Sequence, residues 1–266
     1  DGELIQSEEI DIPRPVMMHD WNITRNYVIF MDLPLVFDLD QAVSGSDPFG
    51  FRPECGARLG VMPRDGSNKD IKWIDINPCF VFHPMNAYEE DNKIILHVCR
   101  QNKAMVGGMD EIYGGKDTTG KLWKWTINLD AETCKEEQID DAACDFARVD
   151  DRLTGLKAKN GYAMAIDENA KTLTFGQFLY KFNLEKNTRT DHDLGDNVFG
   201  GEPVFVPKSK ESSEEKGWVM AIVFDDNIKK SKLIIVDVEN FDKKPVCEVI
   251  LPQRVPFGAH GSWLSN

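Results

Sequence analysis

Trp125-Thr126-Ile127-Asn128-Leu129 is typical of a short strand that ends at an asparagine, and a further polar strand-like segment follows it. The same pattern returns in Tyr180-Lys-Phe-Asn183-Leu184 and in Ile234-Ile-Val-Asp237-Val238. The shared Asn or Asp positions, 128, 183 and 237, lie 55 and 54 residues apart. A period near 50 with several short strands per repeat is typical of the blades of a β-propeller. Periodicity alone leaves similar hairpins in a β-sandwich as an alternative.

Strand signals dominate the rest of the chain as well. Runs rich in Val, Ile, Phe, Trp and Tyr alternate with clusters of Asp, Asn, Gly and Pro, and no stretch keeps the 3.6-residue apolar period of a helix. We therefore expect an all-β fold in a single domain over residues 1–266, with loop excursions at about residues 38–53 and 101–120. The predicted strands are Tyr27–Met31, Arg58–Met62, Ile71–Ile76, Phe80–Phe82, Ile94–Cys99, Leu122–Leu129, Thr172–Gln177, Leu179–Leu184, Trp218–Phe224 and Leu233–Val238.

The charge, hydropathy and cysteine content of the chain limit which partners and compartments it suits. The net charge of −14 argues against nucleic acid, because phosphate binding depends on clustered Lys and Arg. No apolar run approaches the roughly 18 residues of a membrane-spanning helix. The six cysteines are scattered without a CxxC pair, which favours buried thiols in a reducing compartment. We expect a disulfide-free, cytoplasmic protein.

The five histidines fall into two groups. His97 lies in a predicted strand and His192 in a polar segment, so both are expected to be structural or exposed. The other three lie where predicted strands begin or end, beside Pro, Gly or Asn and next to aromatic residues. They are found in Met18-His19-Asp20-Trp21, Phe82-His83-Pro84-Met85 and Ala259-His260-Gly261. Inner strand ends of propeller blades face a common axis, so these three imidazoles are predicted to converge on one metal ion, although a lone histidine in such a setting is more often a core residue.

Five motifs, in order along nearly the whole chain, resemble those of the carotenoid cleavage oxygenases. The likeness is greater to the bacterial branch that includes lignostilbene dioxygenases. The motifs are Met17-Met-His19-Asp-Trp-Asn-Ile-Thr24, Phe82-His83-Pro-Met-Asn-Ala-Tyr-Glu89, Arg148-Val-Asp-Asp-Arg152, Phe199-Gly-Gly-Glu202-Pro-Val-Phe-Val-Pro207 and Gly258-Ala-His260-Gly-Ser-Trp263. The resemblance implies a seven-bladed propeller with Fe(II) held on its axis by four histidines. This chain would cover roughly the C-terminal five blades of that propeller.

By the same resemblance, His19, His83 and His260 match the second, third and fourth iron ligands, and the first ligand lies in missing N-terminal blades upstream of Asp1. Imidazole suits this metal, and each ring needs an acceptor on its other nitrogen to fix its tautomer. Glu202 matches the acceptor for His260, and the acceptor for His19 would lie upstream.

The acceptor for His83 falls at Asp145, where the family usually has glutamate in Glu-Phe-Pro-Arg. Because aspartate is one methylene shorter, the backbone moves in, a water bridges, or the bond is lost; Ala147 in place of proline gives the loop more freedom to compensate. Trp21, Phe82 and Phe146 adjoin the motif positions, and we expect them to line an apolar substrate cleft.

The expected activity is oxidative cleavage of a carbon–carbon double bond in an apocarotenoid, carotenoid or stilbene, with O2 as co-substrate and two carbonyl products. An apolar conjugated substrate is compatible with peripheral contact to a membrane. One alternative is a catalytically inactive propeller fragment that acts as a binding or scaffold module, since one ligand is missing and residue 145 departs from the family pattern. A metal-binding β-sandwich of the cupin type is less favoured, because 64 residues separate His19 from His83 and 177 separate His83 from His260.

Overall fold

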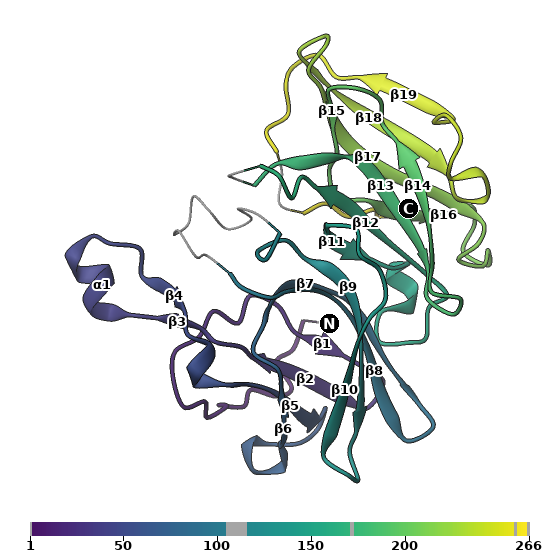
Figure 1. Ribbon diagram of the computed structural model, residues 1–266. Helices are drawn as coiled ribbons and strands as arrows, with labels where there is room; N and C mark the ends of the chain where they lie inside the picture. The colour runs from purple at the N-terminus through teal and green to yellow at the C-terminus, as the bar shows by residue number, and fades with distance from the viewer. Residues whose placement is uncertain (1, 105–115, 171–172, 258–259, 265–266) are drawn as a thin grey trace.

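The computed structural model describes residues 2–104, 116–170, 173–257 and 260–264, and the regular structure in these ranges is nearly all antiparallel β-sheet (Figure 1). The one α-helix among them, α1 (Leu39–Ser44), has six residues. No helix in the described ranges combines the length and the apolar character needed to cross a bilayer. The all-β prediction is confirmed.

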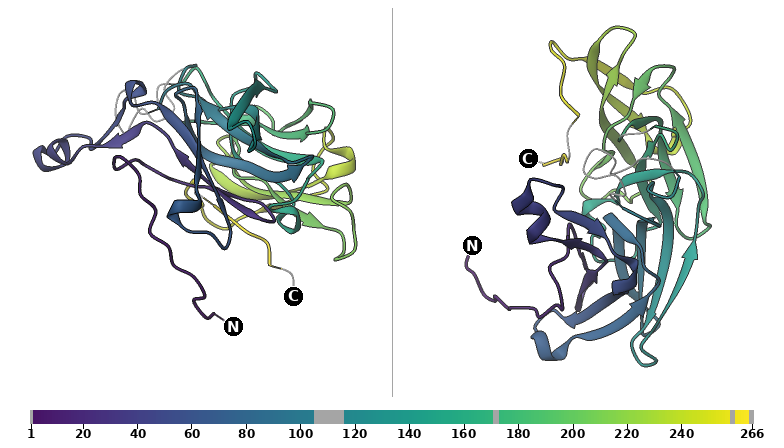
Figure 2. Two further views of the ribbon diagram at one scale, coloured as in Figure 1. Left: turned by 90° about the horizontal axis from the view of Figure 1, so that it is seen from below. Right: turned by 60° about the vertical axis from the view of Figure 1, so that its left-hand side comes forward.

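Four sheets of at least four strands follow one another along the chain in a curved row (Figure 2). In hydrogen-bonded order, the first sheet consists of β1 (Asn22–Ile23), β2 (Tyr27–Asp32), β5 (Ala57–Pro63) and β6 (Lys72–Ile76), and the second of β7 (Phe80–Glu90), β8 (Lys93–Gln101), β9 (Lys121–Asn128) and β10 (Thr133–Gln138). The third sheet consists of β11 (Cys144–Arg148), β12 (Asn160–Ile166), β13 (Phe175–Asn183) and β14 (Thr188–Asp193). In the fourth sheet, β15 (Val198–Phe199) and β16 (Val204–Pro207) both pair with β17 (Gly217–Asp225), which is followed by β18 (Lys230–Asp237) and β19 (Cys247–Ile250). Four such sheets are described, so the expected count of roughly five blades is not confirmed.

The sequence repeat marks the end of the third strand in three of these sheets. Asn128 ends β9, Asn183 ends β13 and Asp237 ends β18. In the first two, the side-chain oxygen accepts from the backbone amides two and three residues further on, at 2.9–3.2 Å, and Asp237 accepts from the amide two residues on at 3.0 Å. Asn and Asp favour turns for this reason, because the side chain replaces a backbone acceptor. The period therefore reports one turn per sheet.

Two strand predictions are wrong in extent. β13 is a single strand, Phe175–Asn183, rather than separate strands over 172–177 and 179–184, and it stays paired with β12 across a register shift between Met164 and Ile166. Residue 172 lies outside the described part of the chain. β7 runs over eleven residues, Phe80–Glu90, instead of ending at Phe82. Its ladder to β8 shifts register on both sides of Pro84, which is where a strand tolerates proline.

The predicted excursion at residues 38–53 contains regular structure. Asp38 caps α1 by accepting from the amides of Asp40 and Gln41, and the helix is carried by the two-stranded ladder of β3 (Leu35–Phe37) and β4 (Phe49–Phe51). Of the excursion at 101–120, residues 105–115 lie outside the described part of the chain. All six cysteines are free thiols, as expected for a disulfide-free protein.

The hydrophobic core runs through all four sheets. One continuous cluster of buried side chains extends from Ile29 in β2 to Phe241 after β18, and Trp125 and Tyr162 are its largest buried members. Within this packing β7 lies against β1 on one side and β11 on the other. The first strands of the first three sheets thus lie side by side, and β15 of the fourth sheet lies against β13.

Candidate metal centre

The three histidines expected to converge lie together. Potential ligand atoms of His19, His83 and His260 are all within 4.8 Å of one another. The His83 ring is 5.1 Å from the His19 ring at 85° and 4.9 Å from the His260 ring at 76°, measured between centroids and ring planes. Rings that are nearly perpendicular at this separation can direct one nitrogen each at a shared point.

The three histidines come from different settings. His19 precedes β1, and His260 follows β19 in a segment whose described residues form no strand, but His83 lies inside β7. The expectation that each histidine marks a strand end is therefore wrong for His83. The register shifts beside Pro84 give its position the irregular backbone that a strand end would have supplied.

Asp145 is the partner of His83. Its Oδ1 lies 3.0 Å from His83 Nδ1 and also accepts the Phe146 amide at 2.8 Å, and the Asp145 side chain is fully buried. The shorter aspartate therefore contacts His83 directly, so the bond is neither lost nor bridged by water. Burial lowers the pKa of His83, but the charge and hydrogen bond of Asp145 raise it, and the net pKa is raised. With Nδ1–H donated to the carboxylate, Nε2 remains available as a metal ligand.

A backbone irregularity brings Asp145 close enough. Phe146 has a φ of +54°, a left-handed conformation that bulky residues seldom adopt, and the β11–β12 ladder shifts register between Asp145 and Arg148. An extra residue in one strand bends it locally and re-aims its side chains. The bulge therefore accounts for the reach of a side chain that is one methylene short.

Glu202 is the partner of His260. Its Oε1 lies 2.9 Å from His260 Nδ1, and its Oε2 accepts the Gly261 amide at 2.7 Å. Glu202 follows Gly201, where a Cβ would lie 2.2 Å from the Ile222 carbonyl oxygen, so glycine is required for this close approach to β17. The Glu202 side chain is only 6% exposed, whereas that of His260 is 49% exposed. A buried acceptor thus orients an imidazole at the surface.

His19 is exposed and its ring packs edge-on against Phe82 at 5.4 Å. Partial burial and then the neighbouring His83 lower its pKa. Sequence reasoning missed the residue that anchors its segment: the Glu89 carboxylate accepts from Thr24 Oγ1 at 2.6 Å and from the Asn26 amide at 2.8 Å. The signal was present, since Glu89 ends the motif that carries His83.

The two histidines predicted to be structural lie outside this cluster. His97 is buried in β8, and His192 in β14 is buried with its Nδ1 2.9 Å from the Phe241 carbonyl oxygen.

The aromatic residues expected to line a cleft are placed differently from one another. Phe82 and Phe146 are buried, and the Phe146 ring lies 4.4 Å from that of His83. Trp21 is 54% exposed and lines a cavity whose wall includes all three histidines and the polar side chains Asp20, Asn22, Asn86, Arg148, Asp151 and Glu202.

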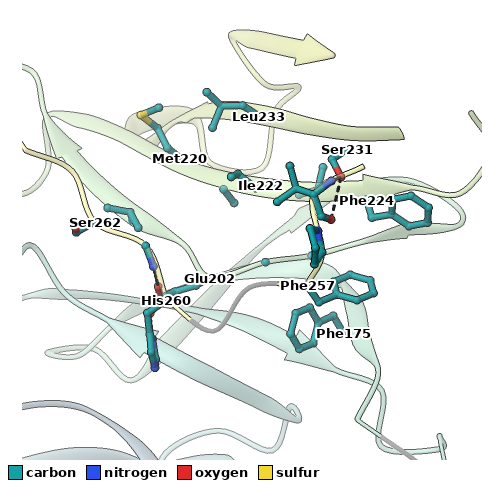
Figure 3. Close-up of a pocket in the computed structure, with 18 of the residues that line it drawn as sticks. Phe175, Glu202, Met220, Ile222, Phe224, Ser231, Leu233, Phe257, His260 and Ser262 are labelled. Carbon is teal, nitrogen blue, oxygen red and sulfur yellow. Dashed lines mark hydrogen bonds and ion pairs between the residues drawn. The ribbon is translucent and has the colours of Figure 1, made fainter. Parts of the chain in front are cut away.

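An apolar pocket lies on the other side of His260 (Figure 3). Its walls come from β17, β18 and the C-terminal segment, which we define as residues 251–257 and 260–264. Met220, Leu233, Phe224 and Phe257 are among its lining side chains, and the His260 ring points away from Met220 and Leu233. The three histidines thus share a cavity of mixed polar and apolar lining, and His260 also borders the apolar pocket.

The model of the family described as retinal pigment epithelial membrane protein (RPE65) matches residues 1–265 of the chain. The chain belongs to this family. Carotenoid 9,10(9',10')-cleavage dioxygenase 1 of Pisum sativum is 34% identical over 287 residues, which cover 100% of this chain and 52% of that protein. The carotenoid cleavage oxygenase of Mycobacterium tuberculosis is 29% identical over 309 residues, 99% of this chain and 61% of that protein.

Solved structures give the same result. The lignostilbene dioxygenase of Pseudomonas brassicacearum superposes with a TM-score of 0.88 at 25% identity and covers 100% of this chain and 58% of its own. Cobalt-substituted apocarotenoid oxygenase of Synechocystis gives a TM-score of 0.85 at 28% identity, with 94% of this chain and 53% of its own covered. The chain spans about half the length of the curated relatives it matches.

The residues present suit a divalent transition metal. Three imidazoles with ring nitrogens within 4.8 Å of one another form a donor set that iron accepts, and two of the rings are oriented by carboxylates at 2.9–3.0 Å.

Proposed function

We propose that the protein carrying this chain is a non-haem Fe(II) dioxygenase that cleaves a C=C bond of an apolar conjugated substrate with O2 to give two carbonyl products. The observation that carries the proposal is the convergence of His19, His83 and His260, with a carboxylate on the outer nitrogen of the last two. Membership of a family whose members include carotenoid and apocarotenoid oxygenases supports it.

In this proposal the three histidines are iron ligands, and Asp145 and Glu202 hold two of them in the tautomer that offers Nε2. Bound iron would supply the redox chemistry needed to activate O2. The chain's own residues position the ligands and shape the surroundings. Phe82 packs against the ring of His19 and Phe146 against the ring of His83, and the apolar pocket beside His260 suits a hydrocarbon chain.

Several finer points belong to the same proposal. A fourth histidine from a preceding part of the protein would complete the ligand set, and the described sheets would be blades of a seven-bladed propeller. Contact with a membrane surface would suit delivery of an apolar substrate. A cytoplasmic location rests on the free cysteines alone.

The test compares two histidine variants in the full-length protein. His260→Ala is expected to abolish iron retention and product formation, because it removes a ligand whose orientation is fixed by Glu202. His192→Ala is the matched control, since His192 is buried and lies outside the cluster. Iron-loaded protein is incubated with O2 and either an apocarotenal or a hydroxylated stilbene, and aldehydes are quantified. Equal iron retention in the two variants would contradict the ligand assignment; absence of aldehydes from both substrates would favour the non-catalytic alternative.

A further inference from the structure

The C-terminal segment, which carries the proposed ligand His260, is held in place by few described hydrogen bonds. After β19, the backbone of Val255 is bound on both sides by the Ser231 hydroxyl, with the Val255 amide donating at 2.9 Å and its carbonyl accepting at 3.3 Å (Figure 3). The next described hydrogen bonds of the segment are those of His260 and Gly261 to Glu202. With a side chain that is 49% exposed, His260 depends on these contacts for its position.

Arg148 closes this contact into a ring. Its Nη1 donates to the Gly261 carbonyl oxygen at 2.9 Å and lies 3.1 Å from Glu202 Oε1, the oxygen that also holds His260. Its Nη2 binds the Asp151 carboxylate at 3.0 and 3.2 Å. The amide and the carbonyl of Gly261 are thus bound by oppositely charged side chains that are themselves paired. Such a closed set fixes both the position and the direction of the backbone next to His260.

The guanidinium also compensates for the burial of the Glu202 carboxylate, from which it lies 3.1 Å. The Glu202 side chain is only 6% exposed, and an ionised group at such a site is costly unless a paired charge and hydrogen bonds compensate. Asp151 and Glu202 keep Arg148 charged: burial lowers the pKa of Arg148, but the two carboxylates outweigh it and the net pKa is raised. Arg148 therefore pairs with the same Glu202 oxygen that contacts His260 Nδ1.

The bulge in β11 explains how Arg148 reaches the centre. In a regular strand, residues three apart point to opposite faces, so Asp145 and Arg148 could not both face the histidines. Here Asp145 pairs with Met164 and Arg148 with Tyr162, which are only two residues apart in β12 and share a face. The extra residue falls where Phe146 has its φ of +54°. One inserted residue places both side chains on the same face.

We propose that Arg148 is a positioning residue for the metal centre, acting through Glu202 and the Gly261 carbonyl to hold the segment that carries His260. This inference rests on the proposed function for the identity of the metal site. The positional part does not, since the clamp consists of contacts between protein groups alone. Arg148 acts on the opposite side of the bulge from Asp145, so β11 orients two of the three histidines.

The experiment compares Arg148→Met with Arg152→Met in the full-length protein. Arg152 is the matched control: it follows the same strand and pairs with Asp150 at 2.5 Å, but it binds the Lys210 carbonyl instead of the centre. Two readouts are used. Hydrogen exchange of peptides containing Gly261 is measured without metal, and release of bound Co(II) to a chelator is followed by its visible absorption.

Arg148→Met is expected to speed exchange at Gly261 and to raise the Co(II) release rate about 10–100-fold, the usual effect of losing an outer contact of a metal ligand. Arg152→Met should match the wild type in both, and Arg148→Lys, which keeps the charge but not the fork, should lie between. If Arg148→Met does not fold, Arg148→Lys alone decides. Wild-type behaviour of the Arg148 variant, or equal loss in the Arg152 variant, would overturn the inference. Failure of the wild type to bind Co(II) would count against the proposed function instead, and the exchange readout would still decide the role of Arg148.

Discussion

Replacing Asp145 by asparagine separates charge from shape at the His83 contact. Asparagine keeps an oxygen at the position that accepts from His83 Nδ1 at 3.0 Å and from the Phe146 amide at 2.8 Å, so the bulge should persist. What is lost is the negative charge. A hydrogen bond to a charged group contributes about 1.5–3 kcal/mol and one between neutral groups about 0.5–1.5 kcal/mol. The difference, about 1–1.5 kcal/mol, corresponds to roughly tenfold weaker metal binding.

The assay is anaerobic competition for Fe(II) or Co(II) between the full-length protein and a chelator of known affinity. Asp150→Asn is the control, because Asp150 is also buried, at 2% exposure, and also binds a charged side chain, the guanidinium of Arg152. We expect Asp145→Asn to bind metal about tenfold more weakly and Asp150→Asn to bind it as the wild type does. Unchanged affinity in Asp145→Asn, or the same loss in both variants, would refute the role of the Asp145 charge in holding His83 for the metal.

Two further predictions concern stability. Burial, and secondarily Lys124, lower the pKa of His97 to about 4 in the folded chain. The pKa in the unfolded chain is about 6.5, so the stabilisation is intact above that pH and is lost as the pH drops from 6.5 towards 4. Between pH 7 and 5, urea unfolding should show the free energy of unfolding of the wild type falling by about 2 kcal/mol more than that of His97→Leu. Equal losses would be inconsistent with a buried neutral His97. Gly201→Ala would place a Cβ 2.2 Å from the Ile222 carbonyl oxygen, whereas the Cβ of Gly200→Ala would meet its nearest atom at 3.3 Å. We expect Gly201→Ala to lower the free energy of unfolding by about 1–3 kcal/mol in thermal unfolding and to speed metal release, and Gly200→Ala to do both much less. The reverse order would contradict this reasoning.

The regular part of the fold could be predicted from the sequence because it repeats. In the turns after Asn128, Asn183 and Asp237, the side chain at the end of the third strand accepts hydrogen bonds from backbone amides that follow it. Local chemistry of this kind is visible in single residues. The extents of β7 and β13 were not, because their continuity depends on pairing with neighbouring strands: β7 stays paired with β8 on both sides of Pro84, and β13 stays paired with β12 across a register shift.

The candidate centre could be predicted only in part. The three histidines and the two carboxylates were identified from motifs, and the structure brings them into contact. Arg148 and Glu89 were present in the same motifs but received no role, since nothing in their spacing shows what they touch. Arg148 reaches Gly261 across 113 residues of chain, and Glu89 reaches Thr24 across 65. Contacts at such separations follow from the arrangement of the sheets.

The irregularities of the first strands explain why the centre forms where it does. Side chains of a regular strand stand perpendicular to the sheet and alternate between its faces, so few can point past a first strand towards a common centre. Between Val81 and Pro84, β7 has three steps against two in β8, and β11 has the same excess over β12 between Asp145 and Arg148.

The fourth sheet follows the same rule. From Phe199 in β15 to Val204 in β16 the chain takes five steps, while β17 takes four between their partners Phe224 and Met220. His83, Asp145 and Glu202 each fall within one of these insertions. Because an inserted residue bends its strand and frees a side chain from the alternation, three sheets can each direct a residue of the centre to the same place. The repeat builds the sheets, and the departures from it aim the residues of the candidate centre.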